Sequence, residues 1–120
     1  MRRRLRLTES NRFYAVRQNG RTAVCPLLVM RALSNGLDYS RFGFVVGKRI
    51  GNAVVRNRVK RRLREAVRQR LADIPAGLDV VFVARAPITG ASWETLCTAL
   101  DRLLRTLPTA RSSEGRPDAD

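Results

Sequence analysis

The sequence predicts a single α+β domain in which three helices pack on a small β-sheet, in the order α-β-β-α-β-α. Two observations lead to this fold class. Apolar residues recur at helical spacing over residues 55–71 and 93–107, and short apolar runs rich in valine and phenylalanine stand between turn signals. The 120 residues, 44% of them hydrophobic, suffice for one domain with a modest core.

A short helix opens the predicted domain. Its segment is RFYAVR (residues 12–17), with Thr8 as the expected N-cap, Glu9 in the first turn and Gly20 at the end. The apolar run over residues 24–33 predicts a strand, which the Ser-Asn-Gly turn at 34–36 ends. A second strand, RFGFVV (41–46), would place three side chains on one face: Phe42, Phe44 and Val46. We expect these two strands to form an antiparallel pair.

The longest periodic segment follows. Asn52 is expected to cap a helix that ends near Asp73, and its apolar stripe has a member every four residues: Val55, Val59, Leu63, Val67 and Leu71. The run LDVVFVA (78–84) predicts a third strand, buried on both faces. A last helix over residues 92–107 would turn inward Trp93, Leu96, Leu100, Leu103, Leu104 and Leu107. Residues 1–107 would form the domain, and residues 108–120, rich in Ser, Gly, Pro and charge, are expected to be a disordered tail.

The net charge points to a polyanionic partner. The chain has twenty-four basic residues, all but two of them arginine, and ten acidic ones, which gives a net charge of +14. Eleven of the basic residues lie between Arg41 and Arg70, where Glu65 is the single acid. A row of like charges on one helix is unfavourable unless it meets an opposite charge. Nucleic acid is the favoured partner, with a membrane surface or an acidic protein as alternatives; the Val, Leu and Ala stripe lacks the aromatic anchors of a membrane helix.

The composition argues against catalysis by this chain alone. It has no histidine, the commonest general base and zinc ligand, and its acids are scattered, whereas a metal nuclease needs clustered carboxylates. Its two cysteines, Cys25 and Cys97, lie in apolar runs and are expected to be buried thiols rather than a disulfide or a ligand pair. The sequence shows neither a membrane-length apolar run nor a signal peptide, so a cytoplasmic location is expected. We therefore predict no catalytic residue and no metal site in this chain.

Residues 41–67, RFGFVVGKRIGNAVVRNRVKRRLREAV, resemble the signature region of the bacterial ribonuclease P proteins. The central element is Arg-Asn-Arg (56–58), followed by Val-Lys-Arg (59–61), and the preceding Lys-Arg-Ile-Gly-Asn-Ala (48–53) also matches. The resemblance covers roughly residues 5–107. It implies an αββαβα two-layer sandwich like domain 2 of ribosomal protein S5, with a left-handed βαβ crossover where general rules favour a right-handed one.

The resemblance also implies a function. Ribonuclease P removes the 5′ leader from precursor tRNA by endonucleolytic cleavage; its RNA subunit and bound Mg²⁺ perform the chemistry, and the protein assists substrate and Mg²⁺ binding. The implied partners are ribonuclease P RNA and precursor tRNA, with no membrane and no protein partner required. The chain would be part of an enzyme only as a holoenzyme subunit. The alternative is a non-enzymatic basic RNA-binding module such as a ribosomal protein.

Two sets of binding residues follow from the resemblance. The RNA subunit would be bound by Lys48, Arg49, Asn52, Arg56, Asn57, Arg58, Lys60, Arg61, Arg62 and Arg64. The 5′ leader would be bound in a cleft beside the first helix by Phe13, Arg17, Phe44 and Arg85. Arg17 stands where many family members have a second aromatic residue, so contact there would be electrostatic. The sequence leaves open whether Phe13 or Tyr14 lines the cleft.

Overall fold

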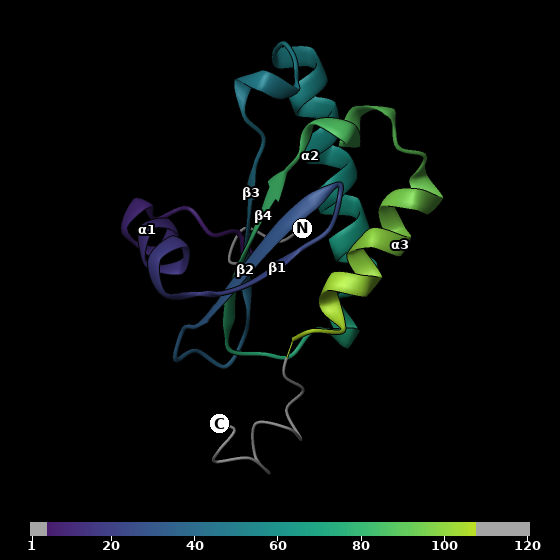
Figure 1. Ribbon diagram of the computed structural model, residues 1–120. Helices are drawn as coiled ribbons and strands as arrows, with labels where there is room; N and C mark the ends of the chain where they lie inside the picture. The colour runs from purple at the N-terminus through teal and green to yellow at the C-terminus, as the bar shows by residue number, and fades with distance from the viewer. Residues whose placement is uncertain (1–4, 108–120) are drawn as a thin grey trace.

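The computed structural model describes residues 5–107 and shows a four-stranded mixed sheet with three α-helices (Figure 1). The order is α1 (Ser10–Asn19), β1 (Arg21–Val24), β2 (Leu28–Ser34), β3 (Arg41–Val45), α2 (Ala53–Arg68), β4 (Leu78–Ala84) and α3 (Trp93–Leu104). Short 3₁₀ helices η2 (Lys48–Ile50), η3 (Leu71–Asp73) and η4 (Ala86–Gly90) lie in the connections. The predicted α+β class is confirmed.

The strand order in the sheet is β1-β2-β4-β3. β2 pairs antiparallel with β1 and with β4, whereas β3 and β4 run parallel and are joined through α2. The predicted antiparallel pairing between the strands over residues 24–33 and 41–46 is therefore wrong, because β4 lies between β2 and β3. Six of the seven residues of β4 are buried, and a strand that is apolar on both faces is most stable in the centre of a sheet.

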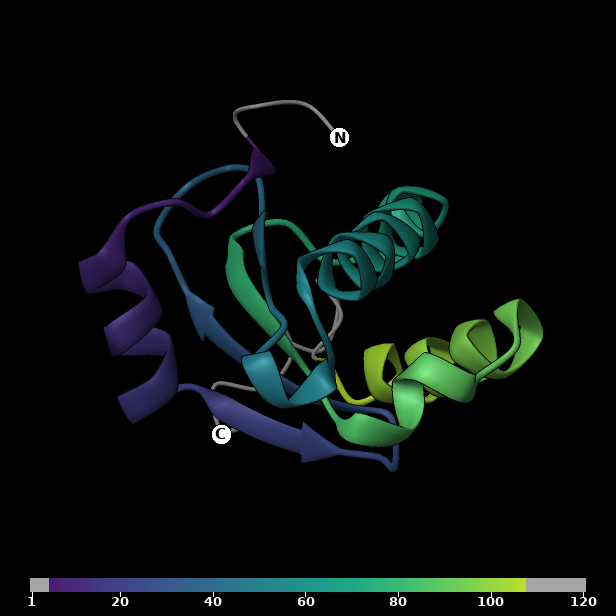
Figure 2. The ribbon, with the colours of Figure 1, turned by 90° about the horizontal axis from the view of Figure 1, so that it is seen from above.

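Helices cover both faces of the sheet. α1 lies on one side, and α2 and α3 lie on the other (Figure 2). The large core between the sheet and α2 and α3 includes Phe42, Leu63, Phe82 and Leu100, while the core under α1 is small: Leu7, Val16 and Val81, with Phe13, Leu33 and Val83 packed against it. The two-layer sandwich that the resemblance implied corresponds to the sheet together with α2 and α3, and α1 adds a third layer on the opposite face.

The structure contains one strand that the sequence did not reveal. The predicted strand over residues 24–33 is a hairpin: β1 ends at Val24, and β2 begins at Leu28. Pro26 has no backbone N–H to give to a ladder, and the Cys25 N–H donates to the Leu28 carbonyl (2.9 Å) to close the turn. The apolar side chains before and after this turn made the two strands look like one.

The helix boundaries follow the capping chemistry. Asn52 caps α2 as predicted: its side-chain oxygen accepts from the Val55 N–H at 3.0 Å. α2 ends at Arg68 instead of near Asp73, because the Arg70 N–H bonds back to Val67 and its guanidinium to the Ala66 carbonyl, which tightens the chain into a turn. α1 begins at Ser10 with Glu9, not Thr8, in the N-cap position. α3 ends at Leu104, and its Trp93 is partly exposed rather than inward.

Candidate nucleic-acid interface

Seven basic side chains along η2 and α2 have no hydrogen bond or ion pair within residues 5–107. They are Lys48, Arg49, Arg56, Arg58, Lys60, Arg61 and Arg64, and we call them the α2 basic face. The buried stripe of α2, which includes Val59 and Leu63, packs on the core and leaves the cations of this helix partly or largely open to solvent, although the Nε of Arg56 is buried. Asn57, Arg58 and Arg61 are exposed. The structure thus brings together most of the residues that the sequence assigned to an RNA-binding surface.

The other four basic residues of this stretch are held by protein groups. Arg41 pairs with Asp79. Arg62, which was predicted to bind the RNA subunit, donates to the Ala91 carbonyl at 2.8 Å and thus fastens α2 to the segment before α3. Arg70 pairs with Asp101. Hydrogen bonds from Arg68 and Gln69 lower the pKa of Glu65 to about 2, so this carboxylate stays ionised and neutralises Arg68. The α2 basic face therefore ends at Arg64.

The approach to α2 depends on a glycine. Gly51 has a φ of 157°, and a Cβ at this position would lie 2.9 Å from the Cβ of Val55. This conformation places Asn52 over the first turn, where its oxygen caps the helix. The oxygen of Asn52 is consequently used within the protein, whereas its amide N–H₂ has no hydrogen bond within residues 5–107.

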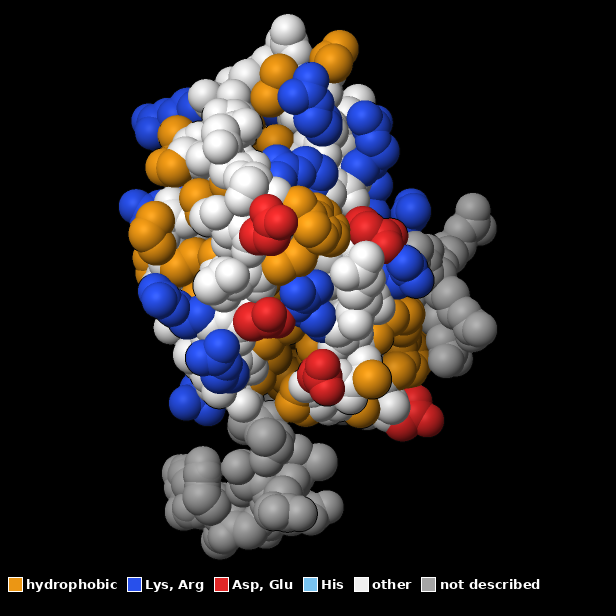
Figure 3. Space-filling model, turned by 90° about the vertical axis from the view of Figure 1, so that its right-hand side faces the viewer, with side chains coloured by type: hydrophobic (Ala, Val, Ile, Leu, Met, Phe, Trp, Pro, Cys, Tyr) orange, Lys and Arg blue, Asp and Glu red, His pale blue; other side chains and the backbone are white. Residues whose placement is uncertain are grey.

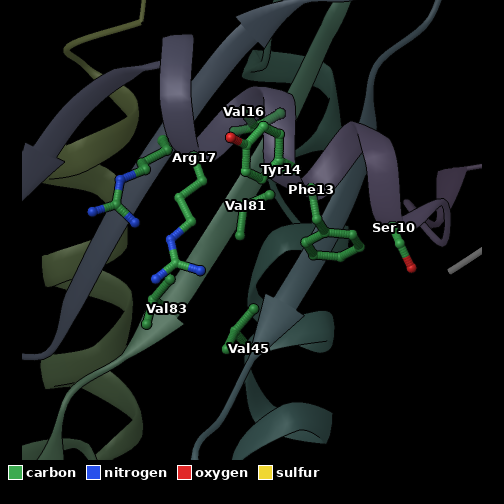
Figure 4. A pocket seen from close by; sticks show the side chains of 9 residues that line it. Ser10, Phe13, Tyr14, Val16, Arg17, Val45, Val81 and Val83 are labelled. Carbon is green, nitrogen blue, oxygen red and sulfur yellow. The ribbon is translucent and has the colours of Figure 1, made fainter.

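A second concave surface lies between α1 and the sheet. This groove has a volume of about 420 Å³, and we call it the α1 groove; its walls are Ser10, Phe13, Tyr14, Val16, Arg17, Arg31, Val45, Val81 and Val83 (Figure 4). The floor is apolar, and Arg17 and Arg31 add positive charge. The Phe13 ring lies directly over Gly43, where a Cβ would be 2.5 Å from Cζ of the ring. Only glycine at position 43 lets the ring settle this deeply.

The structure brings together two of the four predicted leader residues. Phe13 and Arg17 both line the α1 groove, but Phe44 does not. Side chains alternate along β3, so Val45 faces the groove while Phe44 faces the large core and stacks on Phe82, with 5.8 Å between ring centroids. The assignment of Phe44 to the cleft is therefore corrected. Arg85 comes directly after β4 and lies outside the groove lining, and its Nη1 donates to the Cys25 carbonyl at 3.0 Å.

Sequence reasoning left the place of Tyr14 open and did not find Arg31, the second cation of the groove. The sequence left open whether Phe13 or Tyr14 lines the groove, and in the structure both of them do, with Tyr14 66% exposed. Arg31 was not singled out because it lies in an apolar strand. Its neighbours Met30 and Ala32 face the large core, and this alternation is the signal that could have placed Arg31 on the opposite, groove side.

A buried carboxylate fastens the elements around the groove. Asp79 on β4 has no exposed side-chain surface, and its oxygens accept from Arg12 Nε (2.8 Å), Arg41 Nε and Nη2 (2.9 and 2.8 Å) and Asn35 Nδ2 (3.0 Å). Burial raises the pKa of this carboxyl, but the hydrogen bonds from Arg41, Asn35 and Arg12 outweigh burial and lower the pKa below 3.8. Asp79 is therefore a buried anion at neutral pH.

The described residues contain no group of three or more His, Cys, Asp or Glu side chains that could hold a metal ion. Several carboxylates are instead held by arginine, among them Glu9, Glu65, Asp79 and Asp101. The face over α3 mixes acidic, basic and apolar side chains (Figure 3). No helix within residues 5–107 is long and apolar enough to span a membrane. The described residues thus offer two basic surfaces but no metal centre of their own.

Comparison with known proteins gives a consistent result. The profile of the ribonuclease P family matches residues 1–108. The chain is 41% identical over 109 residues to the ribonuclease P protein component of Caldanaerobacter subterraneus, covering 91% of this chain and 94% of that one. It is 42% identical over 106 residues to the component from Roseiflexus castenholzii, covering 88% and 87%. The Thermotoga maritima RNase P protein superposes with a TM-score of 0.79 at 31% identity, covering 85% and 96%.

Proposed function

Because the chain belongs to the ribonuclease P protein family, we propose that its two basic surfaces divide the work of RNA recognition: the α2 basic face binds the catalytic RNA, and the α1 groove receives the 5′ leader of precursor tRNA. As a protein component of ribonuclease P, the chain acts in removing 5′ leaders from precursor tRNA within a ribonucleoprotein. This membership decides against the ribosomal-protein alternative.

The observation that carries the first half of the proposal is the set of seven cations without a partner in the described chain. They follow a single helix and the turn before it, with no acid among them, and such a row of cations can neutralise several phosphates of a folded RNA at once. Arginine can fork onto two phosphate oxygens at once, which suits a surface meant to hold a structured RNA. The exposed Asn57 stands between Arg56 and Arg58 and can add a contact to a sugar or base edge.

The second half rests on the make-up of the α1 groove. A single-stranded leader offers flat bases and a charged backbone, and the groove offers rings and guanidinium groups side by side: Phe13, Tyr14, Arg17 and Arg31. Val45, Val81 and Val83 supply an apolar floor for bases. The exposed Arg85 lies beyond the Val83 end of the groove, where it can meet a leader that extends past the floor.

The Mg²⁺ of the holoenzyme is proposed to be held mainly by the RNA. Carboxylates are the side chains that bind this ion, and those of Glu9, Glu65, Asp79 and Asp101 are already paired with arginines, so the described residues do not fit a magnesium site. The contribution of this chain would be indirect. Its cations offset phosphate charge that the RNA and the precursor tRNA would otherwise need Mg²⁺ to screen.

We further propose that the chain works in the cytoplasm and needs no protein partner. Cys25 and Cys97 are both free thiols, which is typical of a reducing compartment. Both proposed RNA surfaces belong to this one chain, so neither depends on a second protein for completion. The predicted disordered tail, residues 108–120, lies outside the described residues.

Arg17→Ala tests the leader site. We expect the reconstituted holoenzyme to bind long-leader precursor tRNA about fivefold more weakly, because one charge-assisted contact is lost, while affinity for mature tRNA stays the same. Arg21→Ala is the matched control: it removes the same charge from an exposed position on β1 outside the groove. Equal losses for both variants, or equal losses for both RNAs, would contradict a leader site in the α1 groove.

A further inference from the structure

The α1 groove has one wall that is only lightly attached to the rest of the protein. α1 buries a single residue completely, Val16, and its N-terminus has no side-chain cap. The core beneath it is far smaller than the core on the other face of the sheet. Apolar packing alone therefore gives α1 little resistance to shifting over the sheet, and a shift would change the shape of the groove.

Polar links replace the missing apolar contacts. Arg12, which does not line the groove, places its Nε 2.8 Å from Asp79 Oδ2 and its Nη2 3.3 Å from the Ser34 carbonyl. Arg41 joins the same carboxylate and also reaches Glu9, the residue just before α1, at 3.3 Å. Asp79 thus ties α1 to β4 and β3, and β3 and β4 contribute the floor of the groove.

We propose that Asp79 and Arg12 are positioning residues for the leader: they hold α1 at the distance from the sheet at which the α1 groove accepts a single RNA strand. The inference rests on the proposed leader site. Neither residue lines the groove, so neither needs to touch RNA. Arg12 is 27% exposed and turned inward onto a carboxylate that has no exposed surface. The pair acts on the substrate only through Phe13, Tyr14 and Arg17, which α1 carries.

Arg12→Gln is the sharpest probe, because it releases α1 without leaving Asp79 unpaired. The carboxylate keeps its two hydrogen bonds from Arg41 and one from Asn35, so the fold is retained. In the reconstituted holoenzyme we expect the KM for long-leader precursor tRNA to rise about three- to tenfold, with kcat at saturating substrate unchanged. A precursor whose leader is too short to reach the groove should be cleaved as by wild type, and affinity for ribonuclease P RNA should not change.

Two further variants separate positioning from direct contact. Arg12→Lys keeps the charge and can keep one bond to Asp79, so it should restore part of the lost affinity. Asp79→Asn leaves the charge of Arg12 in place but weakens its anchor. Positioning predicts a higher KM for long-leader substrate in Asp79→Asn, whereas direct contact of Arg12 with the leader predicts unchanged or tighter binding. Thermal unfolding would establish that each variant is folded at the assay temperature.

The results separate this inference from the leader site itself. A leader-specific rise in KM for Arg12→Gln and Asp79→Asn, alongside one for Arg17→Ala, would support positioning. A leader-specific effect of Arg17→Ala with none for Arg12→Gln would overturn positioning and leave the leader site standing. If Arg17→Ala also has no leader-specific effect, the leader site fails and the positioning role fails with it. An equal loss for short and long leaders in Arg12→Gln would likewise overturn the inference.

Discussion

Asp79→Ala is expected to lower the free energy of unfolding by about 3–5 kcal/mol, because it leaves two arginines partly buried without their anion. Arg41 and Arg12 are 18% and 27% exposed, and both donate to this carboxylate. A loss of that size is a large share of the 5–15 kcal/mol that typically stabilises a domain. Urea unfolding followed by circular dichroism would measure it.

The carboxylate of Asp79 also makes the free energy of unfolding depend on pH. Because the pKa of Asp79 is lower in the folded protein than its ordinary value of 3.8, its contribution to stability is complete above that value. The contribution falls as the pH drops below 3.8 and through the folded-state pKa. This acid loss should be absent in Asp79→Ala. Glu65→Ala is the control: Arg68 and Glu65 are 52% and 44% exposed, so the loss of this surface pair should cost much less than the loss of Asp79. Equal costs for the two variants would contradict the anchoring role of Asp79.

The second large effect concerns the α2 basic face. Replacing Arg58, Arg61 and Arg64 together by alanine should weaken binding to ribonuclease P RNA by about a hundredfold or more, because three charge-assisted phosphate contacts are lost. The slope of log affinity against log salt should flatten by about two to three, at roughly 0.9 per phosphate. Filter binding over a salt series gives both quantities.

A charge-matched control distinguishes a specific face from general attraction. Arg21, Arg102 and Arg105 are exposed arginines on β1 and at the end of α3, and their triple alanine variant changes the net charge by the same amount. We expect this variant to keep most of its affinity. If both triple variants lose affinity and salt dependence alike, RNA binding depends on the overall charge, and the α2 basic face is not the binding surface.

Much of the fold could be predicted because local chemistry decided it. Asn52 caps α2, the Val59 and Leu63 stripe is buried, and the continuous apolar run of β4 is buried on both faces, all as the sequence indicated. What could not be predicted depends on contacts between distant residues. Nothing near β2 reveals that β4 will pair with it, and the hairpin at Pro26 lies inside an unbroken apolar run.

The binding surfaces show the same division. The α2 basic face was visible as a charge row at helical spacing, although the sequence could not show that Arg62 is held by the Ala91 carbonyl. Phe44 was assigned to the α1 groove, but side chains alternate along β3, and Phe44 lies on the opposite face of the sheet, where it stacks on Phe82. Arg31 could be assigned to the groove only after the structure showed which face of β2 lines it. Asp79 gave no sequence signal of its role, because its partners lie 38 to 67 residues away along the chain.

We propose that this chain supports a catalytic RNA through the α2 basic face, and this role depends on the cations of that face. It is tested most directly by measuring cleavage of precursor tRNA by a bacterial ribonuclease P RNA over a magnesium series, with wild-type protein, with the α2 triple variant and without protein. We expect wild type to lower the Mg²⁺ requirement and to increase cleavage at low Mg²⁺, and the triple variant, at the same concentration, to do neither. The claim is contradicted if wild type leaves the magnesium dependence unchanged, or if the triple variant shifts it as wild type does.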